Sequence, residues 1–318
     1  MLRRPWWLLL AVVLPALAGC GRPAETKFAP AYGCYLGAYV EKDARIGGSM
    51  TRFAQLTGKP HASYFRYVGY GMPFPADWVA EVHALGAIPS IAFEPNKGLA
   101  PVRDDAYLRD WARAAGRARG PIMLRFASEM NGDWSPYHGN PADFVRAFRT
   151  VHDVMAAAAP NVAMVWTPFY TPVGEARDYY PGDRYVDWVG VNIYSVHHYN
   201  KRPDRPAYRA DPRDQLRPIY RVWGTRRPIQ ISEYGATHFC GAEQRDVTDF
   251  AVEKLRTFYR SLPREFPNVK LIYYFDCDAR GPKDSKSGND YALTDDPALL
   301  AAYREVIADD YFRPAPVR

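Results

Sequence analysis

Residues 122–166 read IMLRFASEMNGDWSPYHGNPADFVRAFRTVHDVMAAAAPNVAMVW. The apolar runs Ile122–Phe126 and Val162–Trp166 predict two strands that are buried on both faces. Between them, Pro141–Ala157 has helical apolar spacing, with Asn140 as a capping residue, Pro at the first helical position and a stop before Pro160. A buried strand, an amphipathic helix and a second buried strand form a parallel βαβ unit.

The same alternation continues on both sides of this unit. The other expected strands are Tyr35–Val40, Tyr64–Tyr67, Ile88–Phe93, Trp188–Ile193, Ile229–Ser232 and Val269–Phe275. The other expected helices are Pro75–Leu85, Asp104–Arg119, Asp211–Trp223, Arg245–Leu262 and Pro297–Asp309. The stretch 171–185 is irregular, so we expect a short helix there or none.

Eight strand–helix units in about 285 residues predict an α/β fold, a single (β/α)8 TIM barrel over residues 33–312. The alternative is a doubly wound open sheet, which would place a glycine-rich turn after the first strand. Gly37-Ala38-Tyr39 does not provide that turn. The sequence therefore favours the barrel.

The N-terminus has the features of an export signal. Arg3 and Arg4 precede an apolar run from Trp6 to Leu17, which is too short for a comfortable transmembrane span. Leu17-Ala18-Gly19-Cys20 resembles the bacterial lipoprotein processing site, so we expect a signal peptide over residues 1–19, a lipid on Cys20 and a tether over 20–32. The alternative is cleavage nearby with an unmodified Cys20. In both cases the mature protein is exported, and the lipid would anchor it at the cell envelope.

The chain's charge does not identify a partner. Its 318 residues carry a net charge of +6, and removal of Arg3 and Arg4 with the signal lowers that to +4. The remaining basic residues form no stripe along a helix, so we expect no nucleic-acid partner. We also expect a monomer that needs no cofactor.

Carboxylates stand where the expected strands end, which is where TIM barrels place their active sites. They are Glu94, Glu129 and Glu233, at the ends of the third, fourth and seventh strands. Glycosidic bond hydrolysis needs one protonated carboxyl and one ionised carboxylate, which retaining enzymes hold about 5–5.5 Å apart. Aromatic rings near the strand ends would supply platforms for sugar rings. They are Trp134, Tyr137, Trp166, Phe169, Tyr170, Tyr194, Tyr199, Tyr234 and Tyr274.

Three segments resemble glycoside hydrolase family 26. Arg125–Gly132, extended by Trp134, Pro136 and Tyr137, resembles the acid/base signature of that family. Ile231–Gly235 resembles its nucleophile segment, and Val189–Tyr194 its sixth strand. The resemblance implies a TIM barrel with catalytic glutamates on strands 4 and 7, and activity on β-mannan, mixed-linkage β-glucan or β-xylan.

Carried over to this sequence, the resemblance makes Glu129 the general acid/base and Glu233 the nucleophile. Tyr194 would hydrogen-bond the nucleophile, while Arg125 and Asn131 would support strand 4. Glu94 would be either a subsite residue or a member of an ion pair at the rim. The full set expected to bind substrate is Arg125, Asn131, Trp134, Tyr137, Trp166, Tyr194, His197, Tyr234, Tyr274 and Glu94.

Ser128 departs from the family pattern, because many members, above all the mannanases, have His at that position. A hydroxyl lacks the reach and the donors of an imidazole, so glucan is expected as much as mannan, and xylan is a third choice. We therefore expect a retaining endo-β-glycanase. The alternative is a non-catalytic carbohydrate-binding surface lipoprotein on the same barrel, and the presence of both glutamates favours the enzyme.

The remaining cysteines and histidines yield weaker expectations. In an oxidising compartment Cys240 and Cys277 could form a disulfide, which would leave Cys34 as a buried thiol. Adjacent histidines face different ways, so His197 and His198 are not expected to share a metal, and His197 would line the substrate groove. His238 could line it too. The loop Asp276–Asp290 lacks EF-hand spacing, and no metal is expected.

Overall fold

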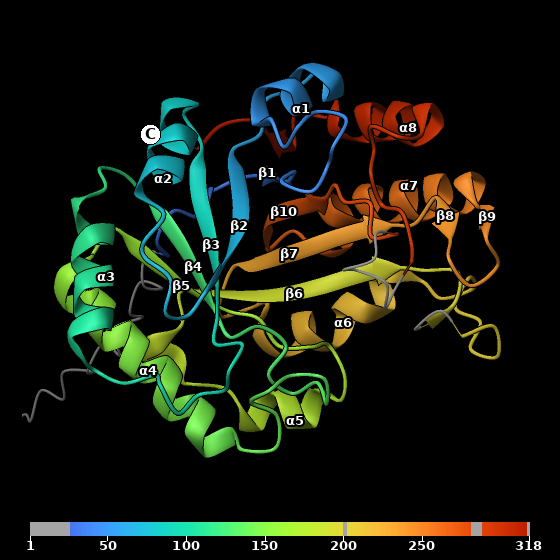
Figure 1. The fold of residues 1–318 in the computed structure, drawn as a ribbon. Coiled ribbons are helices and arrows are strands. Elements are labelled where there is room, and N and C mark those ends of the chain that lie inside the picture. The colour runs from blue at the N-terminus through green and yellow to red at the C-terminus, as the bar shows by residue number, and fades with distance from the viewer. Residues whose placement is uncertain (1–25, 200–201, 281–287, 317–318) are drawn as a thin grey trace, which may run out of the picture.

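The computed structural model describes residues 26–199, 202–280 and 288–316, and eight parallel strands form a closed barrel (Figure 1). Each strand pairs with the next along the chain, and the last pairs with the first, so the predicted (β/α)8 TIM barrel is confirmed. The barrel strands are β1 (Cys34–Tyr39), β2 (Ser63–Gly69), β3 (Ile88–Glu94), β4 (Ile122–Phe126), β5 (Val162–Trp166), β6 (Trp188–Ser195), β7 (Ile229–Ala236) and β10 (Val269–Phe275).

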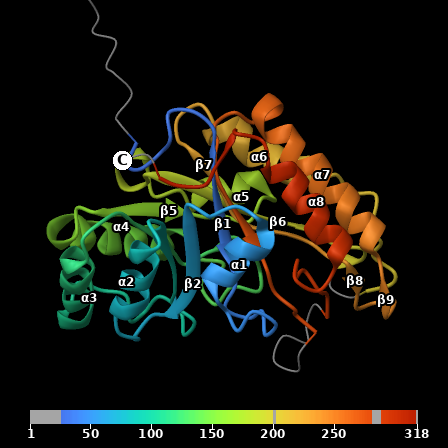
Figure 2. The same ribbon diagram turned by 90° about the horizontal axis from the view of Figure 1, so that it is seen from above.

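Helices form the outer layer around the barrel (Figures 1 and 2). They are α1 (Met50–Thr57), α2 (Ala76–Ala84), α3 (Ala106–Arg117), α4 (Pro141–Ala158), α5 (Val173–Asp178), α6 (Pro212–Trp223), α7 (Thr248–Glu265) and α8 (Pro297–Ile307). A 3₁₀ turn, η1 (Asp183–Tyr185), follows α5, and a two-residue strand, β11 (Phe312–Arg313), pairs with β1. The sequence pattern did not predict α1, whose ends are fixed by Ser49 as N-cap and Gly58 in the left-handed conformation.

The start of α7 differs from the expected helix Arg245–Leu262. Arg245 and Asp246 instead form β9 (Arg245–Asp246), which pairs with β8 (Phe239–Cys240) in an antiparallel hairpin after β7. The helix therefore begins at Thr248 and runs on to Glu265. Since the hairpin follows β7, it lies at the end of the barrel where the site residues are expected.

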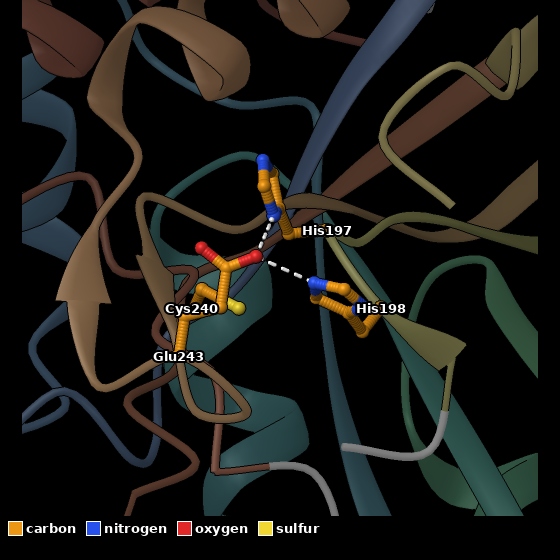
Figure 3. Close-up of side chains that lie close together, drawn as sticks. All are labelled: His197, His198, Cys240 and Glu243. Atoms are coloured by element: carbon orange, nitrogen blue, oxygen red, sulfur yellow. Dashed lines mark hydrogen bonds and ion pairs between the residues drawn. The ribbon is translucent and has the colours of Figure 1, made fainter. Parts of the chain in front are cut away.

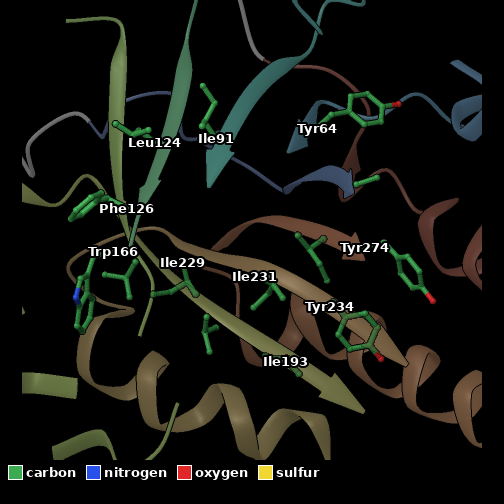
Figure 4. Packing of buried hydrophobic residues seen from close by; sticks show 14 of the residues in the cluster. Tyr64, Ile91, Leu124, Phe126, Trp166, Ile193, Ile229, Ile231, Tyr234 and Tyr274 are labelled. Carbon is green, nitrogen blue, oxygen red and sulfur yellow. The ribbon is translucent and has the colours of Figure 1, made fainter. Parts of the chain in front are cut away.

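Two apolar clusters lie on the two sides of the barrel wall. The larger one, the outer cluster, combines strand residues with helix residues such as Phe53, Phe148 and Phe258, and Figure 4 shows part of it. The smaller one contains strand and loop residues only and fills the barrel interior. Along β4, Leu124 and Phe126 belong to the outer cluster, so Arg125 between them faces inward.

A bulge in β7 changes which residues face the interior. The register of β6 with β7 passes from Val191 opposite Ile231 to Asn192 opposite Glu233, so β7 has one extra residue. Ile231 and Tyr234 both belong to the outer cluster, and Glu233 lies on the inner side. The bulge therefore turns Glu233 inward.

Part of the segment expected as a tether contacts the end of the barrel where the strands begin. Nζ of Lys27 lies 2.8 Å from the carbonyl oxygen of Val162, and Trp188 Nε1 donates to the Lys27 carbonyl at 2.8 Å. Phe28 and Ala29 pack against the inner cluster. The expected signal peptide and Cys20 lie outside the described residues. Within those residues, no helix is long and apolar enough to cross a membrane.

Candidate active site

Glu129 lies in the loop directly after β4, and Glu233 lies within β7. Both positions agree with the strand ends predicted from the sequence. The amide of Glu129 donates to the carbonyl of Thr167 at 2.8 Å, which fixes the loop after β4 to the end of β5. Ala127 and Glu129 have φ values of 51° and 54°. Two non-glycine residues in the left-handed region cost free energy, and such conformations concentrate at functional sites.

Glu233 accepts three hydrogen bonds from side chains. Tyr67 Oη lies 2.5 Å and Arg125 Nη2 2.7 Å from its Oε1, and Tyr194 Oη lies 2.5 Å from its Oε2. The residue is only 6% exposed, so these donors replace water around the carboxylate. The three donors therefore fix the orientation of the carboxylate.

Glu129 has a different environment. Asn192 Nδ2 lies 3.0 Å from its Oε1, and Trp134 Nε1 lies 3.0 Å from its Oε2. Burial, and next the negative charge of Glu233, raise the pKa of Glu129 to about 7, although these two donors lower it. At neutral pH one glutamate is thus protonated in a large fraction of molecules, while the other is surrounded by donors.

Arg125 and Asn192 connect the two carboxyl groups. Arg125 Nη1 donates to the Asn192 side-chain oxygen at 3.5 Å, and Nη2 of the same guanidinium pairs with Glu233. The guanidinium also lies over the rings of Phe65 and Tyr67, with its Cζ 5.1 and 5.5 Å from the ring centroids. Because Arg125 is only 2% exposed, the carboxylate of Glu233 and the two rings compensate its charge in place of water.

Glu94 orders the residue before Glu129. The hydroxyl of Ser128 donates to Glu94 Oε1 at 2.7 Å, its amide to Oε2 at 3.1 Å, and the Tyr137 hydroxyl to Oε2 at 3.0 Å. The structure thus gives Glu94 a hydrogen-bonding role in this loop, and Tyr137, 8% exposed, is its partner.

Asn131 and Trp134 lie on the same loop with different exposures. Asn131 is buried, and its side chain exchanges hydrogen bonds with the backbone of Phe169 at 3.0 and 2.8 Å, so it joins the loops after β4 and β5. Trp134 is 56% exposed and meets Phe169 edge to face. Trp134 can therefore contact a ligand, and Asn131 acts on the loop that carries Glu129.

Three aromatic residues predicted to bind substrate are instead part of the outer core, and Figure 4 labels all three. Trp166 packs against Trp223, and Tyr234 stacks on Phe258 with ring centroids 4.8 Å apart. Tyr274 is also fully buried and donates to the carbonyl of Tyr291. The prediction was wrong for Trp166, Tyr234 and Tyr274 because position near a strand end does not decide which face a side chain occupies.

The cysteines differ from expectation, and His197 has a partner that the sequence did not predict. Nδ1 of His197 lies 3.0 Å from Oε1 of Glu243, in the turn of the β8–β9 hairpin. In the described part of the chain Cys34, Cys240 and Cys277 are all buried thiols, and the expected Cys240–Cys277 disulfide is absent. Cys277 packs in the inner cluster, whereas Cys240 lies beside His197.

Sequence reasoning missed two residues that contact the glutamates. Tyr67 is the last residue of the strand expected at Tyr64–Tyr67, so the rule that selected the glutamates could have selected it too. Asn192 lies in the segment that resembles the sixth strand of the family, and its side chain donates a hydrogen bond to Glu129. Both positions follow from reading every strand end, polar or aromatic, as a candidate.

Comparison with known proteins identifies related sequences and folds. The model of Glycosyl hydrolase family 26 matches residues 102–205, which include Glu129 and Tyr194. The chain is 24% identical over 294 residues to Endoglucanase H of Acetivibrio thermocellus, covering 86% of this chain and 30% of that protein. It is 34% identical over 88 residues to Beta-1,3-xylanase TXYA of a Vibrio species, covering 26% and 19%. The chain thus spans less than a third of either relative.

A solved structure with the same fold is a modular endo-β-1,4-mannanase from Cellulomonas fimi. The TM-score is 0.65 at 16% identity, and the match covers 88% of this chain and 71% of that one. At this identity the likeness concerns the barrel alone. Together with the family model, these matches confirm the resemblance to family 26, a family of glycoside hydrolases.

Proposed function

We propose that this relative of glycoside hydrolase family 26 is a retaining endo-β-glycanase that cleaves a β-linked polysaccharide by double displacement. The observation that carries the proposal is the difference between the environments of the two glutamates. Glu233 accepts hydrogen bonds from Tyr67, Arg125 and Tyr194, whereas the pKa of Glu129 is raised to about 7 by burial and by Glu233. Retaining hydrolysis needs this division between a nucleophile and an acid.

In the first step the carboxylate of Glu233 attacks the anomeric carbon, and the bond to the leaving oxygen breaks. Glu129 donates its proton to that oxygen, which leaves as a sugar hydroxyl, and a glycosyl ester on Glu233 remains. In the second step the carboxylate of Glu129 accepts a proton from water as the water attacks the same carbon. The ester bond then breaks, and both glutamates return to their starting states.

We propose β-1,4-mannan or a β-glucan as the substrate, with xylan as the third polymer. The names of the relatives support a range of backbones, since an endoglucanase and a β-1,3-xylanase align with this chain. Ser128 supports glucan alongside mannan, because its hydroxyl is committed to Glu94 and provides no imidazole beside Glu129. Exposed Trp134, which donates to Glu129, is the aromatic side chain best placed to contact a sugar ring.

The proposal is tested by incubating residues 21–318 with mannan, mixed-linkage glucan, xylan and cellulose. We expect oligosaccharides from at least one polymer, released with the β configuration when the products are followed by NMR. Glu129→Gln and Glu233→Gln should each lower the rate by several orders of magnitude. Binding without hydrolysis by the unsubstituted protein would support the non-catalytic alternative, and products of inverted configuration would contradict the retaining mechanism.

Azide distinguishes the roles of the two glutamates. With an aryl oligosaccharide, Glu129→Ala should still form the glycosyl ester, and azide should then yield a product of retained configuration. Glu233→Ala should yield a glycosyl azide of inverted configuration, because azide attacks the substrate directly. The reverse pattern would exchange the two roles.

We also propose that the protein is exported, processed before Cys20 and anchored at the cell envelope by a lipid on that residue, as a monomer. The support is the sequence of residues 1–20. Metabolic labelling with a fatty acid should label the unsubstituted chain and not Cys20→Ser. Equal labelling of both would contradict the anchor, and light scattering of residues 21–318 would test the monomer.

A further inference from the structure

Four side chains with metal-binding atoms converge beside the open end of the barrel (Figure 3). His197 and His198 follow β6, while Cys240 and Glu243 belong to the β8–β9 hairpin. One nitrogen from each histidine, the Cys240 sulfur and a Glu243 oxygen all lie within 4.8 Å of one another. Glu243 Oε1 is 3.0 Å from Nδ1 of His197 and 2.5 Å from Nε2 of His198.

Local backbone geometry brings the two histidines together. Adjacent side chains alternate in a regular strand, but β6 ends at Ser195, and His198 forms an isolated bridge with Pro206. The centroids of the two imidazole rings are 5.3 Å apart, and a nitrogen of each ring lies within hydrogen-bonding distance of the same oxygen of Glu243. The expectation that the two adjacent histidines face different ways is therefore wrong, since both rings reach one carboxylate oxygen.

The hairpin supplies the other two atoms. Cys240 ends β8 and Glu243 lies in the following turn, a spacing of three residues that keeps both side chains on one side. Arg245 pairs with Oε2 of Glu243, which leaves Oε1 directed at the histidines.

We propose that His197, His198, Cys240 and Glu243 bind one zinc ion that joins the loop after β6 to the β8–β9 hairpin. Imidazole nitrogen, thiolate sulfur and carboxylate oxygen are all ligands that zinc binds, and four of them allow a tetrahedral site. On binding, the Cys240 thiol releases its proton to solvent, and each imidazole coordinates through the nitrogen that now contacts Glu243 and carries its proton on the other ring nitrogen. Cys240 and His198 are 1% and 8% exposed, whereas the Glu243 side chain is 27% exposed, so the site is buried on the side of Cys240 and His198.

This zinc would be structural. Four protein ligands leave no open position for substrate or water, in contrast to catalytic zinc sites. The site begins three residues after Tyr194, which donates to Glu233, so the ion would stabilise a loop that adjoins the substrate groove. The inference concerns these loops and stands whether or not the chain hydrolyses a polysaccharide.

A second cluster of similar residues is already neutralised. Asp290 and Asp295 lie near His238, but Arg280 lies 2.7 Å from Asp290 and 3.2 Å from Asp295. Arg45 pairs with Asp295 as well. Because arginines occupy the carboxylates of that cluster, the zinc proposal is restricted to the four residues near β6.

The test uses the mature chain without a histidine tag, stripped with a chelator and then supplied with zinc. Elemental analysis after gel filtration should find about one zinc per chain, and zinc should raise the melting temperature by several degrees. Cobalt in place of zinc should give the visible spectrum of a tetrahedral site and a thiolate charge-transfer band. The thiolate band reports Cys240 directly and needs no variant.

Cys240→Ser and His198→Ala should each weaken zinc binding about 100-fold or more and abolish the rise in melting temperature. Cys277→Ser removes another buried thiol and should leave the affinity unchanged. Less than a tenth of an equivalent of zinc at micromolar concentration would overturn the proposal and leave a hydrogen-bonded cluster. A cobalt complex without a thiolate band, or unchanged affinity in folded Cys240→Ser, would also overturn it.

Discussion

Nη2 of Arg125 lies 2.7 Å from Oε1 of Glu233, and the two side chains are 2% and 8% exposed. An ion pair with so little water leaves a costly unpaired charge when one partner is removed. The guanidinium also keeps a positive charge next to the proposed nucleophile. Stability and activity therefore depend on the same contact.

Replacing Arg125 with Met should destabilise the fold by about 3–5 kcal/mol, because Glu233 then stays buried without its cation. Hydrolysis should fall by orders of magnitude. Urea unfolding and initial rates measure the two effects. Arg109→Ala removes an arginine from a surface pair with Asp104 and should change neither quantity. Wild-type stability in Arg125→Met would contradict the assigned ion pair.

Tyr194→Phe and Tyr67→Phe should each lower kcat about 10- to 100-fold, with a smaller effect on KM. Each removes one hydroxyl that lies 2.5 Å from Glu233, and a hydrogen bond to a charged group is worth about 1.5–3 kcal/mol. Steady-state kinetics on the preferred polymer provide the measurement. Tyr32→Phe, at a 67% exposed position, is the matched control. Unchanged kcat in both site variants would show that the donors do not act on the reaction.

The pH profile of kcat/KM should fall above about pH 7, because Glu129 must be protonated to act as the acid and its pKa is about 7. Trp134→Phe keeps a ring but removes the donor to Glu129. Since that donor lowers the pKa, the alkaline limb should move to higher pH in the variant. Trp78→Phe alters a tryptophan that packs on Arg66 and should leave the limb in place. A shift to lower pH in Trp134→Phe would contradict the geometry.

Glu129→Gln should stabilise the protein at pH 8 by about 3 kcal/mol and give no gain at pH 4. The folded-state pKa lies above the ordinary value of 4.5, so the folded state binds more protons and stability falls as pH rises from about 4.5 to 7. Glutamine carries no charge, and this loss should disappear. Denaturant unfolding across this pH range measures the difference. Equal pH dependence in both proteins would contradict the raised pKa.

Two tryptophans with opposite environments should respond differently to Ala. Trp166→Ala opens a cavity in the outer core and should cost about 3–5 kcal/mol of stability. Trp134→Ala, at an exposed position beside Glu129, should raise KM about tenfold with a much smaller loss of stability. Urea unfolding and kinetics on both variants test this contrast. A specific KM effect in folded Trp166→Phe would restore the original expectation for Trp166.

The sequence alone determined the fold class and the positions of Glu129 and Glu233 on the barrel. Continuous apolar runs such as Ile122–Phe126 mark strands covered on both faces, and their regular alternation with helices specifies a parallel barrel. Because such barrels carry their sites at the carboxyl ends of strands, Glu129 and Glu233 could be selected by position. These are local patterns, and local patterns are present in the chain before it folds.

Tertiary structure decided which neighbours of these residues face the site. The bulge in β7 turns Glu233 inward and Tyr234 outward, and it appears as a register shift against both neighbouring strands, β6 and β10. The convergence of His197 and His198 on Glu243 likewise depends on a hairpin that begins 41 residues after His198 and on the end of β6. The register between paired strands decides which face of the sheet each side chain occupies. The hydropathy pattern of a single segment does not determine that register.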